Sequence, residues 1–418
     1  MGDRPFDRDA GEPAVSVLIL LLALLQQPAG FQPPRVKTGA QVLLEHRLSL
    51  LSGKRVGLIT NHTGRLASGE LLLDALVRSG ITVTALFGPE HGIRGTSGAG
   101  ETVADSLDRA TGIPVYSLYG RIRKPVPAML ERVDVLVYDM QDVGARFYTY
   151  LSTLGLCMEA AAEKGIPFVV LDRPDPLGGD LVDGPVLPDS LRSFVGAFPI
   201  PVVYGLTAGE LASMANGEGW LARGERAELT VVRMEGWTRS MRWEQTGLPW
   251  VPPSPNIRRP GTQFIYPATC YLEATNISEG RGTGEPFHII GAPFLRVGEL
   301  SRLIRGSHHD DIAVVDTVFT PGESKYRGVT CTGVHLEVVS EDSIRPVAAG
   351  LGILSALVRS CGDSLSVNRR GLARLLGDPD AIDLLRQGKR VGEIARRWEA
   401  PLRAFREKSA VYFAYPER

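Results

Sequence analysis

The chain has 418 residues, which at roughly 150 residues per domain suggests two or three domains. Apolar residues make up 44% of the chain and charged residues 22%, so the composition supports ordinary hydrophobic cores and excludes global disorder. Lys and Arg total 46 against 47 Asp and Glu, a net charge of −1 that argues against nucleic acid as the main partner.

The N-terminus holds one short apolar segment. Residues 14–25 read AVSVLILLLALL, in which Ser16 is the polar exception. This segment is too short to span a bilayer, which takes about 20 apolar residues, but it fits the apolar region of a secretory signal peptide. We therefore expect residues 1–35 to be a signal peptide or N-terminal anchor, and the protein to be exported to the periplasm or beyond. We expect no other stable membrane span.

From residue 36, short apolar runs alternate with helical patterns. The runs predict strands at 55–60, 81–87, 133–138 and 167–171, and a long helix is predicted over 145–164. Strands that are apolar on both faces and separated by helices indicate a parallel sheet covered on both sides. The sequence therefore predicts an α/β fold, with a Rossmann-like, doubly wound, mostly parallel sheet over residues 36–225.

The regular alternation fades after residue 225. Strands are predicted near 227–234, 311–319 and 329–339, and a helix near 347–359. We therefore expect residues 226–418 to form a second, auxiliary domain of mixed α+β type.

Polar loops rich in Gly and Pro follow all four strands of the first predicted domain. In such sheets, ligands bind outside the carboxyl ends of the strands. Glu90 follows the second strand, and a carboxyl partly removed from water at that edge suits a general acid. Asp139 and Asp142 follow the third strand, and the Arg146 guanidinium suits capture of a substrate carboxylate. The alternatives are helix caps for the carboxylates and an Asp142–Arg146 ion pair.

Other catalytic and metal motifs are weak or missing. His62 and His91 follow two different strand ends and could form a metal site with Asp139, but they lack the usual ligand spacing, so we expect no metal there. No G-x-S-x-G elbow follows a strand and no G-x-G-x-x-G follows the first one, which disfavours a serine nucleophile and a dinucleotide cofactor. We expect no cofactor.

Two polar loops in the second half add candidate ligands for a sugar. Asn256 lies in PPSPN, and residues 273–284 (EATNISEGRGTG) supply Asn276, Glu279 and Arg281. Amides and arginines beside carboxylates are typical of a carbohydrate subsite. Glu279 is a second catalytic candidate, and the alternative for it is an ion pair with Arg281.

Seven motifs, in order, resemble those of the bacterial exo-β-N-acetylmuramidase family known as NamZ. They are GLITNHTG (57–64), LFGPEHGIRG (86–95), YDMQDVGARFYTYLSTL (138–154), LDRPDPLGG (171–179), YGLTAGELA (204–212), LPWVPPSPNI (248–257) and TNISEGRGTGEPF (275–287). The resemblance implies a Rossmann-like domain and an auxiliary domain with the active site between them. It also implies release of terminal N-acetylmuramic acid from the non-reducing ends of peptidoglycan fragments.

The resemblance also implies roles for particular residues. The proposed catalytic glutamate of the family falls on Glu90, and Asp175 stands where the family's DRPNP motif has Asn. Glycoside hydrolysis commonly uses a second carboxylate, for which Asp142, Asp139 and Glu279 qualify, unless the 2-acetamido group of the substrate assists. We expect Asn61, His62, His91, Asp139, Asn256 and Asn276 to contact substrate, and the lactyl carboxylate to be recognised by one of Arg94, Arg146 and Arg281.

Two readings from other classes stay open at this point. One is a cell-wall sugar-binding protein that uses the same cleft without turnover. The other is a metal-dependent amidase or esterase built around His62, His91 and Asp139.

Overall fold

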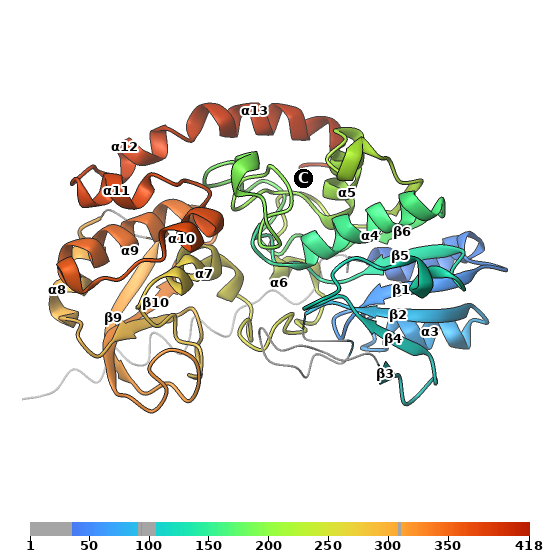
Figure 1. Ribbon diagram of the computed structural model, residues 1–418, viewed down its shortest axis with the longest axis horizontal. Helices are drawn as coiled ribbons and strands as arrows, with labels where there is room; N and C mark the ends of the chain where they lie inside the picture. Colours follow the sequence, from blue (N-terminus) through green and yellow to red (C-terminus); the bar gives the residue numbers. More distant parts are fainter. Residues whose placement is uncertain (1–35, 91–92, 94–105, 308–310) are drawn as a thin grey trace, which may run out of the picture. The chain divides into compact units, whose positions relative to one another are not determined.

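A seven-stranded sheet forms the first half of the fold in the computed structural model, which describes residues 36–90, 93, 106–307 and 311–418. The expected signal segment, His91 and Arg94 lie outside these residues. The strand order is β3-β4-β2-β1-β5-β6-β7 (Figure 1). Every neighbouring pair is parallel except β3 and β4. The strands are β1 (Arg55–Thr60), β2 (Thr82–Gly88), β3 (Ser106–Leu107), β4 (Pro114–Ser117), β5 (Val135–Asp139), β6 (Phe168–Leu171) and β7 (Leu229–Val232).

Helices cover this sheet on both faces, because the central strands are apolar on both sides. Val56 and Leu58 of β1 pack with the helices α2 (Gly39–Val42) and α3 (Leu72–Arg78). Ile59 faces the other way, into the core shared with α4 (Tyr150–Lys164) and α5 (Ala208–Gly217). Figure 1 shows α4 and α3 on opposite sides of the strands. The predicted doubly wound, mostly parallel sheet is confirmed.

The long helix after β5 begins later than the sequence pattern indicates. We expected it to start at residue 145, but α4 starts at Tyr150. Gly144 adopts a positive φ of 75°, and the N–H of Arg146 donates to Val202 O in an isolated bridge, so residues 142–149 form a loop instead of a first helical turn. The helix ends where predicted, with Gly165 in the left-handed conformation at its C-cap.

The second half contains a small antiparallel sheet and most of the remaining helices. Its strand order is β8-β10-β9, with β8 (Ile289–Ala292), β9 (Ile312–Phe319) and β10 (Cys331–Val338). This sheet and its helices match the predicted mixed α+β part (Figure 1). The helices are α6 (Trp243–Thr246), α7 (Thr262–Thr269), α8 (Val297–Arg305), α9 (Pro346–Cys361), α10 (Arg369–Leu376), α11 (Ala381–Arg386), α12 (Val391–Arg396) and α13 (Glu399–Ser409).

The two halves share structure across the boundary that we expect near residue 225. Strand β7 lies beyond that position, yet it pairs with β6 of the large sheet. The chain end also returns to this sheet, since the Tyr415 hydroxyl donates to Asp172 Oδ2 at 2.5 Å and accepts from the N–H of Met234. The boundary itself stays a prediction.

Two further sequence features have a simple structural outcome. All four cysteines are free thiols. Within the described part of the chain, no helix is both long enough and apolar enough to cross a membrane.

Candidate active site

A large cleft lies beyond the carboxyl ends of β2 and β4 and is lined on its other side by loops and helix residues of the second half. Its volume is about 760 Å³, in the usual range for small-ligand sites. Four residues predicted from the sequence line it together: Glu90, Asn256, Glu279 and Arg281. The other lining residues include Tyr119, Arg123, Phe147, Thr149, Phe194, Tyr266, Glu273, Glu323 and Lys325. A smaller recess that also contains Glu90 extends toward Phe287 and Ser254.

Glu90 stands at the end of β2 and is half-buried. Gly88, two residues earlier, pairs with Ser117 of β4 and accepts a hydrogen bond from the N–H of Leu118 at 2.8 Å, which holds the strand end in place. The hydroxyl of Thr149, just before α4, donates to Glu90 Oε2 at 3.0 Å. Burial and the nearby Glu90 carboxylate raise the pKa of the Tyr119 phenol to about 12, so this phenol keeps its proton near neutral pH.

The facing wall carries a ladder of alternating charges. Glu279 is only 2% exposed, and it lies between Lys325 Nζ, 2.9 Å from Oε2, and Arg281 Nε, 3.3 Å from Oε1. Arg281 also contacts the carboxylate of Glu273. The ion pair with Arg281, which we gave as the alternative to a catalytic role for Glu279, is therefore present, and Glu279 is a charge-compensated carboxylate within the cleft.

One cation of the cleft differs from the rest. Arg123 places its guanidinium 4.3 Å from the centroid of the Phe194 ring, and Phe194 itself packs against Tyr119. Among the described residues Arg123 forms no ion pair, whereas Lys325 and Arg281 are both paired with carboxylates. Among the described lining residues, Arg123 is therefore the cation that has no carboxylate partner and can meet an anionic ligand.

Asn61 and His62 hold a loop of the cleft instead of lining it. The Asn61 amide donates to the Tyr150 hydroxyl at 2.6 Å, and Tyr150 donates in turn to Pro253 O at 2.9 Å. His62 Nε2 lies 2.7 Å from Pro252 O. These contacts fix the PPSPN segment, whose Asn256 lines the cleft with an Oδ1 atom that has no hydrogen-bond partner among the described residues.

Asp139 forms a buried structural ion pair. Both of its oxygens accept from Arg173, at 2.6 Å from Nε and 3.0 Å from NH2. Arg173 also donates to the carbonyl of Arg65. Asp139 therefore links the end of β5 to the loop after β6 and does not line the cleft, contrary to our expectation of a substrate contact.

Asp142 lies in a buried pair of carboxyls behind the cleft. It accepts hydrogen bonds from the Tyr204 hydroxyl and, at 2.9 Å, from the N–H of Gly144. Burial raises the pKa of Asp142 to about 6, and burial together with the neighbouring Asp142 charge raises the pKa of Asp175 well above its usual value. One oxygen of each carboxyl is buried without a hydrogen-bond partner among the described residues. Asp142 does not line the cleft that holds Glu90.

Arg146 and Asn276 also take structural positions. Arg146 is 1% exposed and donates to the carbonyls of Pro185, Ile200 and Leu375, so it neither pairs with Asp142 nor lines the cleft. The Asn276 amide exchanges hydrogen bonds with the backbone of residues 364–366. The expectation for Arg146 depended on a first helical turn at residue 146, and that turn is absent because α4 begins at Tyr150.

Several lining residues were not predicted from the sequence. Tyr119 and Arg123 follow β4, a strand of only four residues that the hydrophobic pattern did not reveal. Thr149 lies within the YDMQDVGARFYTYLSTL motif, where its position before the helix could have identified it. Lys325 belongs to the connection between β9 and β10, and its place beside Glu279 follows only from tertiary structure.

Comparisons with known proteins give one consistent result. Residues 56–261 match the family model of the exo-beta-N-acetylmuramidase NamZ N-terminal domain, and residues 264–415 match that of the C-terminal domain. The chain is 44% identical to the peptidoglycan beta-N-acetylmuramidase NamZ of Bacillus subtilis (strain 168), over 91% of this chain and 92% of that protein.

Two solved structures show the same fold. Both are DUF1343 family proteins from Bacteroides fragilis NCTC 9343. One is 37% identical with a TM-score of 0.84, covering 91% of this chain and 99% of that chain. The other is 32% identical with a TM-score of 0.75, covering 92% of this chain and 99% of that chain.

Proposed function

The chain belongs to the NamZ family of exo-β-N-acetylmuramidases, and on that premise we propose that it is a glycoside hydrolase that removes terminal N-acetylmuramic acid from the non-reducing ends of peptidoglycan fragments. The observation that carries the proposal is the pairing, within one sugar-sized cleft, of the hydroxyl-bonded Glu90 with the ion-paired Glu279. Most glycosidases use two carboxyl groups that lie in chemically different environments.

Glu90 is the general acid in this proposal. It lies at the carboxyl edge of the sheet, where the cleft gives a substrate direct access to its carboxyl group. The Thr149 hydroxyl holds one oxygen in place, and the protonated Tyr119 phenol lies beside it. Glu90 would give its proton to the glycosidic oxygen as the bond to the anomeric carbon breaks, and water would supply the hydroxyl of the released sugar.

Glu279 is the protein group best placed to assist Glu90. Of the three partners suggested by the sequence, Glu279 lines the cleft, whereas Asp139 and Asp142 are engaged in buried contacts outside it. Lys325 and Arg281 hold the Glu279 carboxylate in place through ion pairs, and a positioned carboxylate can act as a base, as a nucleophile or as a group that orients the 2-acetamido substituent.

Arg123 is the residue that we assign to the lactyl carboxylate. N-acetylmuramic acid carries this carboxylate and N-acetylglucosamine does not, so a free cation in the cleft can distinguish the two sugars. Arg123 is that cation among the described residues, and its guanidinium can accept a carboxylate through two parallel hydrogen bonds while it stays stacked on Phe194. Arg281, which we also considered, is committed to Glu273 and Glu279.

The cellular location is part of the proposal. We propose that the protein is exported, because the apolar segment at 14–25 fits the apolar region of a signal peptide. The segment lies outside the described residues, so its support comes from the sequence alone.

The decisive experiment uses short glycans of defined ends. We expect the purified protein to release free N-acetylmuramic acid from a disaccharide with N-acetylmuramic acid at the non-reducing end, and to leave glycans that begin with N-acetylglucosamine intact. Chromatography of the products measures both results. Binding of the disaccharide without any release of sugar would replace the hydrolase with a sugar-binding protein.

A further inference from the structure

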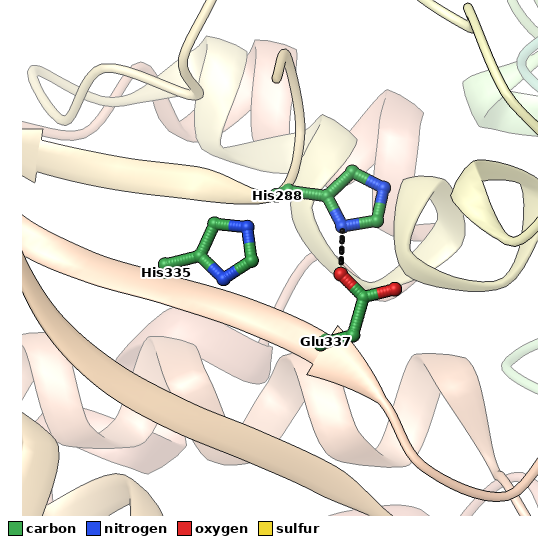
Figure 2. A group of neighbouring side chains, drawn as sticks. All are labelled: His288, His335 and Glu337. Carbon is green, nitrogen blue, oxygen red and sulfur yellow. Dashed lines mark ion pairs between the residues drawn. The ribbon is translucent and has the colours of Figure 1, made fainter. Parts of the chain in front are cut away.

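A cluster of two histidines and two carboxylates lies on the small antiparallel sheet, apart from the cleft residues. His335 and Glu337 are two residues apart on β10 and therefore point to the same face of the sheet. His288 meets them from the segment that leads into β8, and Figure 2 shows its ring directed at Glu337. Glu285 approaches from the same segment.

The ligand atoms of this cluster converge. One nitrogen of His288, one of His335 and one oxygen of Glu337 all lie within 4.8 Å of each other. His288 Nδ1 is 3.2 Å from Glu337 Oε2, and His335 Nε2 is 2.9 Å from Glu285 Oε2. A tetrahedral ion with bonds of about 2.0–2.1 Å separates its ligand atoms by about 3.4 Å, so both contacts are already close to the spacing that such an ion needs.

The His335 Nε2 atom lies beside the Glu285 carboxylate but forms no hydrogen bond among the described residues. Although Nε2 is 2.9 Å from Glu285, the geometry is not that of a hydrogen bond, and this buried atom has no hydrogen-bond partner among the described residues. A buried ring nitrogen without a hydrogen-bond partner costs free energy unless something binds to it.

His288 is held by the contact that a metal-binding histidine usually makes. Its Nε2 lies 3.1 Å from the Thr262 hydroxyl at the start of α7. When Nε2 carries the proton and donates to Thr262, the Nδ1 lone pair points at the cluster. Such outer contacts orient metal-binding histidines in known sites. In the other tautomer Nδ1–H donates to Leu336 O at 3.1 Å, and a bound ion would select against it.

A positive group already occupies the centre of this cluster. The Arg259 NH2 group is 2.7 Å from Glu337 Oε2, 3.2 Å from His288 Nδ1 and 3.7 Å from Glu285 Oε1. The side chain of Arg259 is 42% exposed, so it can swing into solvent without leaving a cavity in the core. Two carboxylates against one guanidinium leave the cluster with a surplus negative charge, which favours a divalent ion.

We propose that His288, His335 and Glu337, with Glu285 as a fourth ligand, bind a divalent transition-metal ion of the zinc type in the place that the Arg259 guanidinium occupies. Imidazole nitrogen with carboxylate oxygen is a donor set that suits zinc, whereas magnesium prefers oxygen alone. Glu285 belongs to the same loop as Glu279 and Arg281, so the ion would tie the loop of the cleft's charged wall to β10.

Calorimetric titration of the tag-free, chelator-treated protein with zinc chloride tests this site. We expect one zinc ion per chain, with no competition from magnesium. His335→Gln and Glu337→Gln should each weaken zinc binding by at least ~10-fold, since each removes a direct ligand. Arg259→Gln should strengthen zinc binding several-fold, because it removes the competing cation.

The matched control is His46→Gln, which removes an exposed histidine beside Glu45 and should leave the titration unchanged. Circular dichroism of each variant shows whether it is folded, and the opposite direction expected for Arg259→Gln separates a site from general loss of structure. Zinc binding that is absent from the wild type, unaffected by the two ligand substitutions or not strengthened by Arg259→Gln would overturn the proposal.

Discussion

Replacing Glu90 by Gln removes a proton donor and leaves almost everything else in place. Gln has the same shape, and its amide oxygen can still accept the hydrogen bond that Thr149 donates at 3.0 Å. Because Glu90 is half-buried and Gln matches it in size, we expect a folded variant. General acid catalysis contributes at least ~100-fold, which corresponds to about 2.7 kcal/mol of transition-state stabilisation. We expect turnover of the muramyl disaccharide to fall by at least that factor.

The leaving group shows whether the lost function is acid catalysis. A sugar hydroxyl is a poor leaving group and needs a proton, whereas a nitrophenolate leaves readily without one. If Glu90 is the general acid, Glu90→Gln should impair hydrolysis of the disaccharide much more than that of an aryl N-acetylmuramide. Steady-state kinetics on both substrates measures this difference.

Thr149→Val provides the comparison for the same site. It removes the hydroxyl that holds Glu90 but keeps the carboxyl group, so we expect a smaller loss of turnover that is of similar size for both substrates. Near-normal hydrolysis of the disaccharide by Glu90→Gln would exclude Glu90 from the mechanism. An equally large loss on both substrates would contradict its role as the acid.

Two further predictions concern Arg123 in the cleft and the buried carboxyl groups of Asp142 and Asp175. Arg123→Gln should weaken inhibition by free N-acetylmuramic acid by about tenfold, which is the effect of losing one charge-assisted hydrogen bond. Inhibition by N-acetylglucosamine should not change. Equal changes for both sugars, or the same effect in the control variant Arg121→Gln, would refute the assignment of Arg123. Burial raises the folded-state pKa of Asp142 to about 6 and that of Asp175 well above the unfolded value of about 3.9. The folded protein therefore keeps protons that the unfolded chain releases, and its stability falls as the pH rises above about 4. The variant Asp175→Asn replaces one buried carboxyl by a neutral amide that does not titrate. Its thermal unfolding at about pH 8 should therefore show a stability gain on the order of 2 kcal/mol and a weaker pH dependence than the wild type. Identical melting of the two proteins at about pH 5 and 8 would show that the buried Asp175 carboxyl carries no such cost.

The fold was predictable because the local sequence of each central strand is enough to identify it. Each is a continuous apolar run that ends in a Gly- or Pro-containing loop, and Gly165 marks the end of α4. Strand β4 was missed because Pro114–Ser117 has only four residues, and only every second one of them is buried, so the segment is not a continuous apolar run. The start of α4 was misplaced because residues 145–149 have helical spacing, while the N–H of Arg146 donates to Val202 O in an isolated bridge between Ala145 and Val203.

Only part of the site could be predicted, because the position of a residue at the end of a strand does not determine which other residues its side chain contacts. Glu90 and Asp139 both follow central strands, yet Glu90 faces the cleft and Asp139 is taken by Arg173, a residue from another loop. Arg146 lies near the same edge of the sheet, but its partners are three backbone carbonyls, one of them 229 residues away at Leu375. Such pairings depend on tertiary structure, which local pattern does not contain.

The structure also explains why several motif residues matter without touching the cleft. Asn61 and His62 hold the backbone of Pro253 and Pro252, through Tyr150 in the first case, and that backbone presents Asn256 to the cleft. Substitution at such a position would change where Asn256 lies and leave its chemistry intact. The motifs of this chain therefore combine two kinds of residue, those that line the cleft and those that hold the lining residues in place. The polar lining of the cleft is concentrated on two walls, with hydroxyl groups around Glu90 and ion-paired side chains around Glu279. An acidic sugar that enters between these walls would meet one uncommitted cation among the described residues, and the position of Arg123 beside Tyr119 would bring the lactyl group to the same wall as the proton donor.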